Sequence, residues 1–527
     1  MNGTSEREAL LERGGSSVSS DGEEGAQALA PGGGSGQQLD ACERPESAAA
    51  GPQNGDDAKL GTKRCSMFEG MGTFSQVCSV LSRTAAGGRG LFAQSYLVFI
   101  INALKDVWHE DYGVCFGSAQ RRNVSVATLM GAVCGMFVFG LMVDVVGKKN
   151  CAVLVSLTTL VGAAAVAVTP PYEPRGREHC ELLFDRLAMG LFVIGLGFGG
   201  EYPVSASLAS EASKQETKRG RDILLTFSMQ GWANVASVAV VALMYNTLKH
   251  DGVWRASIAM AIIILAWSFV ERLISLRRHN AAKQSPAYEA GAPKVDVDTY
   301  FVLSYYGRRL VGTALSWFLL DVVFYGNALF AGAILTSAIG DNVKPNMHFA
   351  YLLLFAAFAM PGYYAAALMI DQPWLGRKKL QTGGFLALGV LYIYIGIFFS
   401  SLQQHAALFI FFYALTFIFS GFGPNTTTYL IPSEVFASPV RGTLHGISAA
   451  SGKLGAVVGV FVVAWLEESF GSSLVLVLLG SIAFAGAVVT RLCIPDSTAV
   501  SLDVEEKQFA EAAAAFARAQ PALQQGI

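Results

Sequence analysis

Charged side chains are scarce in this sequence: Asp, Glu, Lys and Arg make up only 15% of its 527 residues. A soluble globular protein carries roughly 25% charged residues, so this chain lacks the charge that would solvate a folded surface. Hydrophobic residues account for 52% of the chain, and the net charge is only −2. This composition excludes an ordinary soluble domain, indicates a protein of the lipid bilayer, and argues against a nucleic acid partner.

Clustered metal ligands and catalytic motifs are also missing. The eight cysteines are scattered, without a Cys-x-x-Cys pair or a Cys/His cluster, so neither a metal site nor a redox motif is predicted. Cys115 and Cys180 fall in two loops on the same predicted side, where they could form a disulfide, although two free thiols are the simpler interpretation. We find no usable nucleotide-binding loop or catalytic triad, so we expect neither an enzyme nor a bound cofactor.

Long apolar segments recur along most of the chain. Crossing a hydrocarbon core takes about 20 predominantly apolar residues, and at least six segments or their apolar centres meet that need. The sequence predicts an all-α membrane protein with twelve transmembrane helices in two pseudo-symmetric six-helix bundles. The predicted helices are 88–107, 123–144, 151–169, 183–210, 222–247, 255–276, 310–338, 347–370, 380–400, 405–430, 442–466 and 472–492.

The loops between these segments predict the orientation and the domains. One alternate set of loops, which includes Lys148, Arg272 and Arg377, is clearly richer in Lys and Arg and is predicted to be cytosolic, as are both termini. We expect an integral membrane protein of the plasma membrane. The predicted domains are a disordered cytosolic tail at 1–80, a first bundle at 88–276, a cytosolic linker at 277–309, a second bundle at 310–493 and a cytosolic tail at 494–527.

The two halves repeat acidic and basic motifs at corresponding helix ends. Gly140-x3-Asp-x2-Gly-Lys-Lys ends the second helix, and Asp371-x4-Gly-Arg-Lys-Lys ends the eighth. Such a repeat places the substrate between two related bundles, near the middle of the membrane. Ion pairs among these residues would hold the cytosolic side shut. The predicted gating residues are Asp144, Lys148, Lys149, Glu211, Arg219, Asp371, Arg377, Glu434 and Arg441.

Polar and charged side chains inside the apolar helices form the candidate site. Trp317, Asp321 and Tyr325 are spaced i, i+4 and i+8, so they share one face of the seventh helix. Lys453 lies in a Gly- and Ala-rich helix, remote from both membrane ends. Charges in such helices are functional by default, and a small oxyanion needs a cation together with neutral donors. Tyr202, Gln230 and Asn425 on helices four, five and ten supply further donors.

Four strings resemble the phosphate:proton symporter family of major facilitator transporters, as found in plant and fungal high-affinity phosphate transporters. They are Gly-Gly-Glu-Tyr-Pro-Val-Ser at 199–205, Trp-Phe-Leu-Leu-Asp-x-x-Phe-Tyr at 317–325, Phe-Gly-Pro-Asn-x-Thr-Thr at 422–428 and His-Gly-Ile-Ser-Ala-Ala-x-Gly-Lys at 445–453. The resemblance implies the major facilitator fold and a set of phosphate ligands, with Asp321 also responding to protons and Glu201 on the proton path. The implied ligands are Tyr202, Gln230, Trp317, Asp321, Tyr325, Asn425 and Lys453.

Three positions depart from that family. The usual first helix carries two aspartates, where this chain has Gln94 and Leu97, and the usual aspartate of helix four is Glu201. An amide forms hydrogen bonds but does not titrate, so coupling must depend on Glu201 and Asp321, change stoichiometry or be absent.

The predicted function is secondary transport of inorganic phosphate by alternating access, coupled to protons. The alternatives left open are transport of an organic phosphate such as a glycerophosphodiester, an uncoupled facilitator or exporter, and a phosphate sensor. A sensor would call for a long cytosolic domain, and both predicted tails are short and featureless.

Overall fold

The computed structural model describes residues 74–113, 115–170, 177–213, 218–248, 251–283, 298–339, 345–498 and 501–524. The chain divides into two units, Met1–Gly70 and Met71–Ile527, and the architecture below is that of the second unit. Most of the predicted disordered tail, residues 1–73, lies outside the described residues, as does the linker stretch 284–297.

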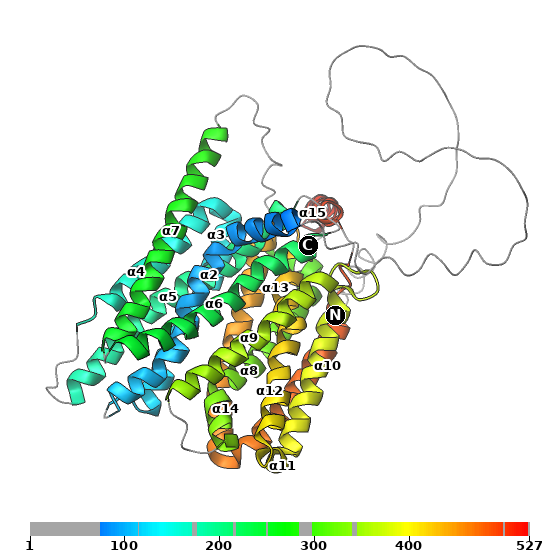
Figure 1. The fold of residues 1–527 in the computed structure, drawn as a ribbon. Coiled ribbons are helices and arrows are strands. Elements are labelled where there is room, and N and C mark those ends of the chain that lie inside the picture. The colour runs from blue at the N-terminus through cyan, green and yellow to red at the C-terminus, as the bar shows by residue number, and fades with distance from the viewer. Residues whose placement is uncertain are drawn as a thin grey trace, which may run out of the picture. The chain divides into compact units, whose positions relative to one another are not determined.

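Every regular element within the described ranges is a helix (Figure 1). The helices are α2 (Phe74–Asp111), α3 (Ser118–Val146), α4 (Lys148–Ala167), α5 (Arg177–Ala212), α6 (Arg219–Thr247), α7 (Asp251–Lys283), α8 (Thr299–Ile339), α9 (Pro345–Met369), α10 (Gly376–Ile397), α11 (Phe399–Gln403), α12 (Ala406–Phe422), α13 (Pro424–Glu434), α14 (Ser438–Cys493) and α15 (Leu502–Gln524).

The twelve predicted helices correspond to these elements. Ten helical segments among the described residues are long and apolar enough to cross a membrane. One of them, α14, contains the last two predicted helices, because Gly471 (φ 80°) breaks its regular geometry between them. The tenth predicted helix is α12 followed by α13, with Gly423 between them, and the first lies within α2. The all-α prediction is therefore confirmed.

Two seams join the helices of the first half, α2 to α7, to those of the second. α3 packs against α14, and α6 packs against α9. A β-carbon added at Gly446 would lie 2.4 Å from the backbone oxygen of Met136, and one added at Gly140 would lie 3.0 Å from the backbone of Gly446. Glycine at both positions therefore lets α3 and α14 approach backbone to backbone.

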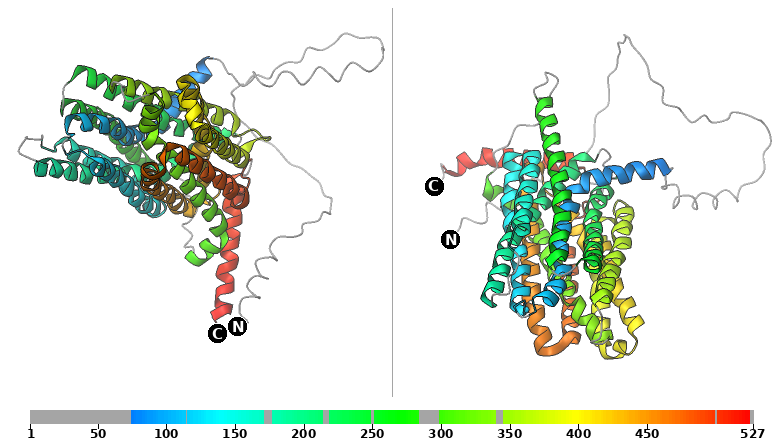
Figure 2. Two further views of the ribbon diagram at one scale, coloured as in Figure 1. Left: turned by 90° about the horizontal axis from the view of Figure 1, so that it is seen from below. Right: turned by 60° about the vertical axis from the view of Figure 1, so that its left-hand side comes forward.

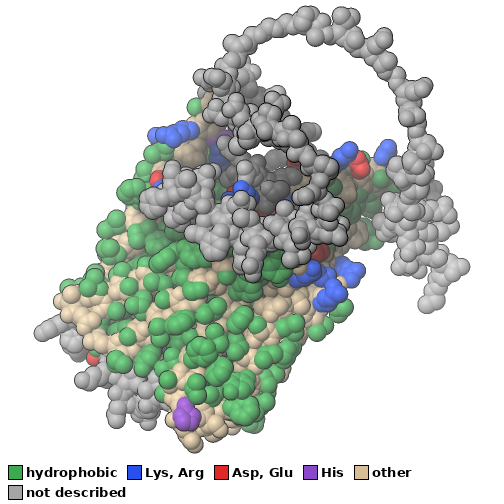
Figure 3. Space-filling view, turned by 45° about the vertical axis from the view of Figure 1, so that its right-hand side comes forward, with side chains coloured by type: hydrophobic (Ala, Val, Ile, Leu, Met, Phe, Trp, Pro, Cys, Tyr) green, Lys and Arg blue, Asp and Glu red, His purple; other side chains and the backbone are tan. Residues whose placement is uncertain are grey.

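The outer surface suits a lipid environment. Large apolar side chains such as Met189 (73% exposed), Leu368 (70%) and Trp267 (65%) point outward. Figure 3 shows hydrophobic side chains spread over the flank of one face, while Lys and Arg gather toward one end. An apolar belt of this extent marks a membrane-embedded surface rather than an aqueous one.

The residues around the predicted linker and C-terminal tail are more ordered than expected. α8 already begins at Thr299, and the tail contains α15, which lies across one end of the helices (Figure 2). Phe509 of α15 stacks on Tyr306 with ring centroids 5.3 Å apart, and Glu505 pairs with Arg309 at 2.6 Å. The expectation of a featureless tail is therefore wrong, because α15 has an apolar stripe that packs on the start of α8.

Cys115 is disulfide-bonded, so the simpler interpretation of free thiols is wrong for this residue. The side chain of Cys180 lies outside the described residues.

Candidate substrate site and gates

A buried lysine on α14 is the centre of the candidate site. Its ammonium donates to the carboxylate of Asp321 at 2.8 Å and to the hydroxyl of Tyr325 at 3.0 Å, both on α8. Lys453 is 2% exposed and Asp321 is 3% exposed. Since Asp321 and Tyr325 are one helical turn apart, the ammonium bridges two successive turns of α8. The face of the seventh helix that was predicted from residue spacing therefore contacts Lys453, the predicted cation.

Aromatic and amide side chains of the first half complete this cluster. The ring of Tyr202 on α5 lies 5.5 Å from the Lys453 ammonium and 5.9 Å from the ring of Trp317. Its hydroxyl donates to the side-chain oxygen of Gln230 on α6 at 2.8 Å. A β-carbon added at Gly452 would lie 2.5 Å from the Trp317 ring, so glycine there leaves room for the indole. The cluster is therefore assembled from both halves.

A cavity of about 90 Å³ adjoins the cluster between the two halves. Three of the predicted ligands, Gln230, Tyr325 and Asn425, line it, and Asn425 donates to the hydroxyl of Tyr363 at 2.7 Å. The other four predicted ligands, Tyr202, Trp317, Asp321 and Lys453, are not among the residues that line the cavity. Tyr202 contacts Gln230, and Lys453 contacts Tyr325. Tyr363 was not among the predicted ligands, because a tyrosine in an apolar helix carries no distinctive sequence signal.

The second buried ion pair lies inside the first half. Glu201 on α5 is 0% exposed and accepts hydrogen bonds from both terminal guanidinium nitrogens of Arg272 on α7, at 2.5 and 2.8 Å. The amide of Gln94 donates to the same carboxylate at 2.8 Å, and Thr159 donates to Gln94 at 3.0 Å. A β-carbon at Gly90 would lie 1.6 Å from the guanidinium, so glycine there keeps the space open.

Arg272 is a second residue, after Tyr363, that the sequence analysis missed. It was counted as a cation of a cytosolic loop, because α7 was expected to end near it. In the structure α7 continues to Lys283, and the side chain of Arg272 turns inward, 15% exposed, to hydrogen-bond Ala152 and Ser156 as well as Glu201. A buried Glu201 without a predicted cation was the signal that could have found it.

The repeated aspartates lie at one end of the helices, which we name the latch end. Each accepts hydrogen bonds from backbone N–H groups near the start of a helix in the other half. Asp144 accepts the backbone N–H groups of Gly442 at 3.0 Å and of Thr443 at 2.7 Å, and Asp371 accepts the backbone N–H of Arg221 at 2.8 Å. The helix dipole stabilises a carboxylate near a helix N-terminus, and the N–H of Arg221, in the first turn of α6, also has no intrahelical partner.

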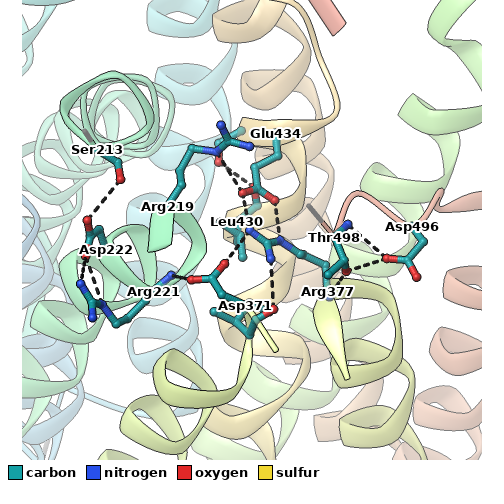
Figure 4. A network of polar contacts seen from close by, with 12 residues as sticks. Ser213, Arg219, Arg221, Asp222, Asp371, Arg377, Leu430, Glu434, Asp496 and Thr498 are labelled. Atoms are coloured by element: carbon teal, nitrogen blue, oxygen red, sulfur yellow. Dashed lines mark hydrogen bonds and ion pairs between the residues drawn. The ribbon is translucent and has the colours of Figure 1, made fainter. Parts of the chain in front are cut away.

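An ionic network joins the halves at the latch end (Figure 4). Glu434 accepts two hydrogen bonds from Arg377 at 2.9 Å and pairs with Arg219 of the first half at 3.3 Å. Asp371 pairs with Arg377 at 2.8 Å. Burial raises the pKa of Asp371, and the Arg377 guanidinium opposes that rise.

The remaining gating residues make other contacts. Lys148 pairs with Glu211 within the first half. Arg441 pairs with Glu506 of α15 at 3.2 Å, not with the first half. Among the described residues, Lys149 makes no ion pair, so its predicted gating role lacks the contact on which it was based.

Contacts between the halves also occur at the opposite end, which we name the mouth end. Asp106 of α2 pairs with His348 of α9 at 3.0 Å and with Arg121 of α3 at 3.4 Å. Asn346 donates to Asn246 of α6 at 3.1 Å. The cavity therefore lies between two sets of polar contacts that join the halves.

Comparisons with known proteins agree with this arrangement. The sequence profile of the family described as "Sugar (and other) transporter" matches residues 95–509. Glycerophosphoinositol permease 1 of Candida albicans is 29% identical over 431 residues, which cover 80% of this chain and 80% of its own. Probable inorganic phosphate transporter 1-6 of Arabidopsis thaliana is 29% identical over 487 residues, with 80% and 92% covered. The solved structure of the proton:xylose symporter XylE with 6-bromo-6-deoxy-D-glucose has a TM-score of 0.66 at 13% identity, covering 82% of this chain and 99% of that one, and shows a shared major facilitator fold.

Proposed function

Because the chain belongs to the sugar (and other) transporter family, within the major facilitator fold, we propose that it transports inorganic phosphate across a membrane by alternating access. The observation that carries this proposal is the buried Lys453 beside a cavity formed by both halves. A buried ammonium, two tyrosine hydroxyls, an indole and two amides suit a small oxyanion that must lose its water. The phosphate transporters among its relatives support the same substrate.

In this proposal Asp321 releases Lys453 to the substrate. Their present contact at 2.8 Å occupies the ammonium that would bind phosphate. Protonation of Asp321 removes the negative charge that competes for Lys453 and that would repel the anion. Phosphate and a proton would then enter together, which is the physical basis of symport.

Glu201 is a weaker candidate for the proton path than the sequence suggested. Its carboxylate already accepts hydrogen bonds from two nitrogens of Arg272 and from the amide of Gln94, so both of its oxygens are occupied by fixed donors. We therefore place proton coupling on Asp321, with Glu201 and Arg272 positioning α5, which carries Tyr202 next to Glu201.

The proposed gates are the inter-half contacts at the two ends. Asp144 and Asp371 each bind the opposite half, and Arg219 of the first half pairs with Glu434 of the second. Opening at the latch end would break these contacts while the six-helix halves, proposed at 88–276 and 310–493, move as units. We place the latch end and both termini in the cytosol and the protein in the plasma membrane, on the loop charges.

A glycerophosphodiester is the second candidate substrate. The cavity extends from Gln230, Tyr325 and Asn425 to Asn102 and Asn234, and these amides could bind the hydroxyl groups of an alcohol esterified to the phosphate. A glycerophosphoinositol permease among the relatives supports it. The sequence gives no comparable support to the alternative of a phosphate sensor.

Uptake of labelled phosphate by the purified protein in liposomes tests the proposal. We expect saturable uptake, accumulation when an inward proton gradient is imposed, and competition by unlabelled phosphate. Competition by glycerophosphodiesters with little phosphate uptake would favour the second candidate. Equilibration without accumulation would leave an uncoupled facilitator, and uptake no greater than in empty liposomes would refute phosphate transport.

A further inference from the structure

A second buried lysine has no part in the scheme above. Lys105 on α2 is 4% exposed, and its ammonium donates to the side-chain oxygen of Asn102 at 3.1 Å. Among the described residues, no carboxylate forms an ion pair with this ammonium within 4.0 Å. The adjacent Asp106 pairs with Arg121 and His348 instead. A buried charge without a direct ion pair is costly, and in a membrane helix it indicates a function.

Lys105 adjoins the cavity that reaches the proposed phosphate site. Asn102 lines that cavity together with Phe99 and Ala103 of α2, and the same cavity is lined by Tyr325, the hydroxyl partner of Lys453. Side chains on a helix lean toward its N-terminus. The ammonium of Lys105 therefore reaches back over the turn that carries Asn102, beside the cavity and close to the mouth end.

We propose that Lys105 and Asn102 form an outer anion site that receives the phosphoryl group before it reaches Lys453. This inference rests on the proposed function. The ammonium supplies the charge, and the amide N–H of Asn102 remains able to donate while its oxygen accepts from Lys105. Positive charge in a cleft with low-dielectric walls raises the local concentration of an anion.

Loss of an outer site should affect the kinetics of uptake differently from loss of Lys453. An outer site increases capture of the anion but takes no part in the proton-linked step at Asp321. Removing its charge should therefore raise the KM for phosphate about tenfold, while the maximal rate stays within about twofold. A purely structural lysine would instead lower the amount of folded protein and the maximal rate.

The experiment is labelled phosphate uptake by Lys105→Cys in liposomes, before and after treatment with thiol reagents. Attachment of an ethylammonium group through a disulfide restores a positive charge at nearly the length of lysine and should return KM to within about threefold of the unmodified wild type. A neutral methylthio group should leave KM high. Wild type and Lys379→Cys, which alters an exposed lysine of α10, receive the same treatments and should keep their KM.

The outcomes separate this inference from the proposed function. Phosphate uptake by wild type with an unchanged KM in Lys105→Cys would overturn the outer site and leave the transport proposal intact. Absence of phosphate uptake by wild type would refute the transport proposal itself. If Lys105→Cys does not fold, Asn102→Asp tests the same site, because it keeps the size of the side chain and supplies a counter-charge to Lys105. A tenfold rise in KM supports the site, and an unchanged KM overturns it.

Discussion

Two of the buried ion pairs, Glu201–Arg272 and Asp321–Lys453, differ in how firmly the cation is held. In the first half, Arg272 binds Glu201 through two guanidinium nitrogens and is itself anchored on Ala152 and Ser156. In the second half, Lys453 makes one contact with Asp321 and one with Tyr325, which lines the cavity. Both pairs join two helices of the same half.

The difference indicates a division of labour. A guanidinium fork matches a carboxylate in a fixed planar geometry, whereas an ammonium is a point charge that can turn to another acceptor. The Arg272 pair is suited to fixing the helices of the first half. The Lys453 pair lies where an anion could take the place of Asp321, so it is suited to exchange.

The largest effect is expected when Lys453 is changed to alanine. This leaves Asp321 buried without its cation and removes the charge proposed to bind phosphate. Loss of one member of a buried pair destabilises the fold by about 3–5 kcal/mol, and loss of the binding charge should separately reduce uptake about a hundredfold. Uptake assays in liposomes, with folding checked by size-exclusion chromatography, measure it. Near-normal uptake would refute the proposed phosphate site.

Asp321→Asn tests where the proton enters the cycle. It keeps the size of the side chain but cannot titrate, so uptake should lose the pH dependence that the wild type shows. The matched change Glu201→Gln should retain that dependence, although it weakens the contact with Arg272. A pH profile that survives in Asp321→Asn and is lost in Glu201→Gln would reverse our assignment of the two pairs.

The Arg272 pair should matter more for stability than for substrate affinity. Arg272→Met leaves the Glu201 carboxylate buried without a counter-charge, and thermal unfolding in detergent should begin several degrees lower. The double change Glu201→Leu with Arg272→Met removes both charges and should recover much of that loss. Equal destabilisation in the single and double variants would show that the charge pairing itself is unimportant.

The smallest effect is expected at the latch end, where Arg219 and Arg441 occupy corresponding positions of the repeat. Arg219→Gln removes a contact between the halves, so it should increase access of thiol reagents to the cavity from the latch end. Arg441→Gln should change that access little, since its partner Glu506 belongs to α15. Similar accessibility in both variants would count against a gating role for the Arg219–Glu434 pair.

The sequence predicted the helices better than the contacts that their side chains make. The spacing of Trp317, Asp321 and Tyr325 placed them on one face, and the structure brings that face to Lys453. Hydropathy could not identify Arg272 as the partner of Glu201, because the two lie 71 positions apart and meet only when α7 packs beside the first half. The sequence also could not show that Arg441 pairs with Glu506 of α15.

The sequence by itself determined that this chain is a helical membrane protein with a repeated arrangement of acidic and basic motifs. That follows because lipid requires long apolar helices, and their length and composition are local properties. Only the tertiary structure decided which buried charges pair. Pairing depends on distances of a few ångströms between helices far apart in sequence, and only those distances show that Glu201 pairs with Arg272 and Asp321 with Lys453.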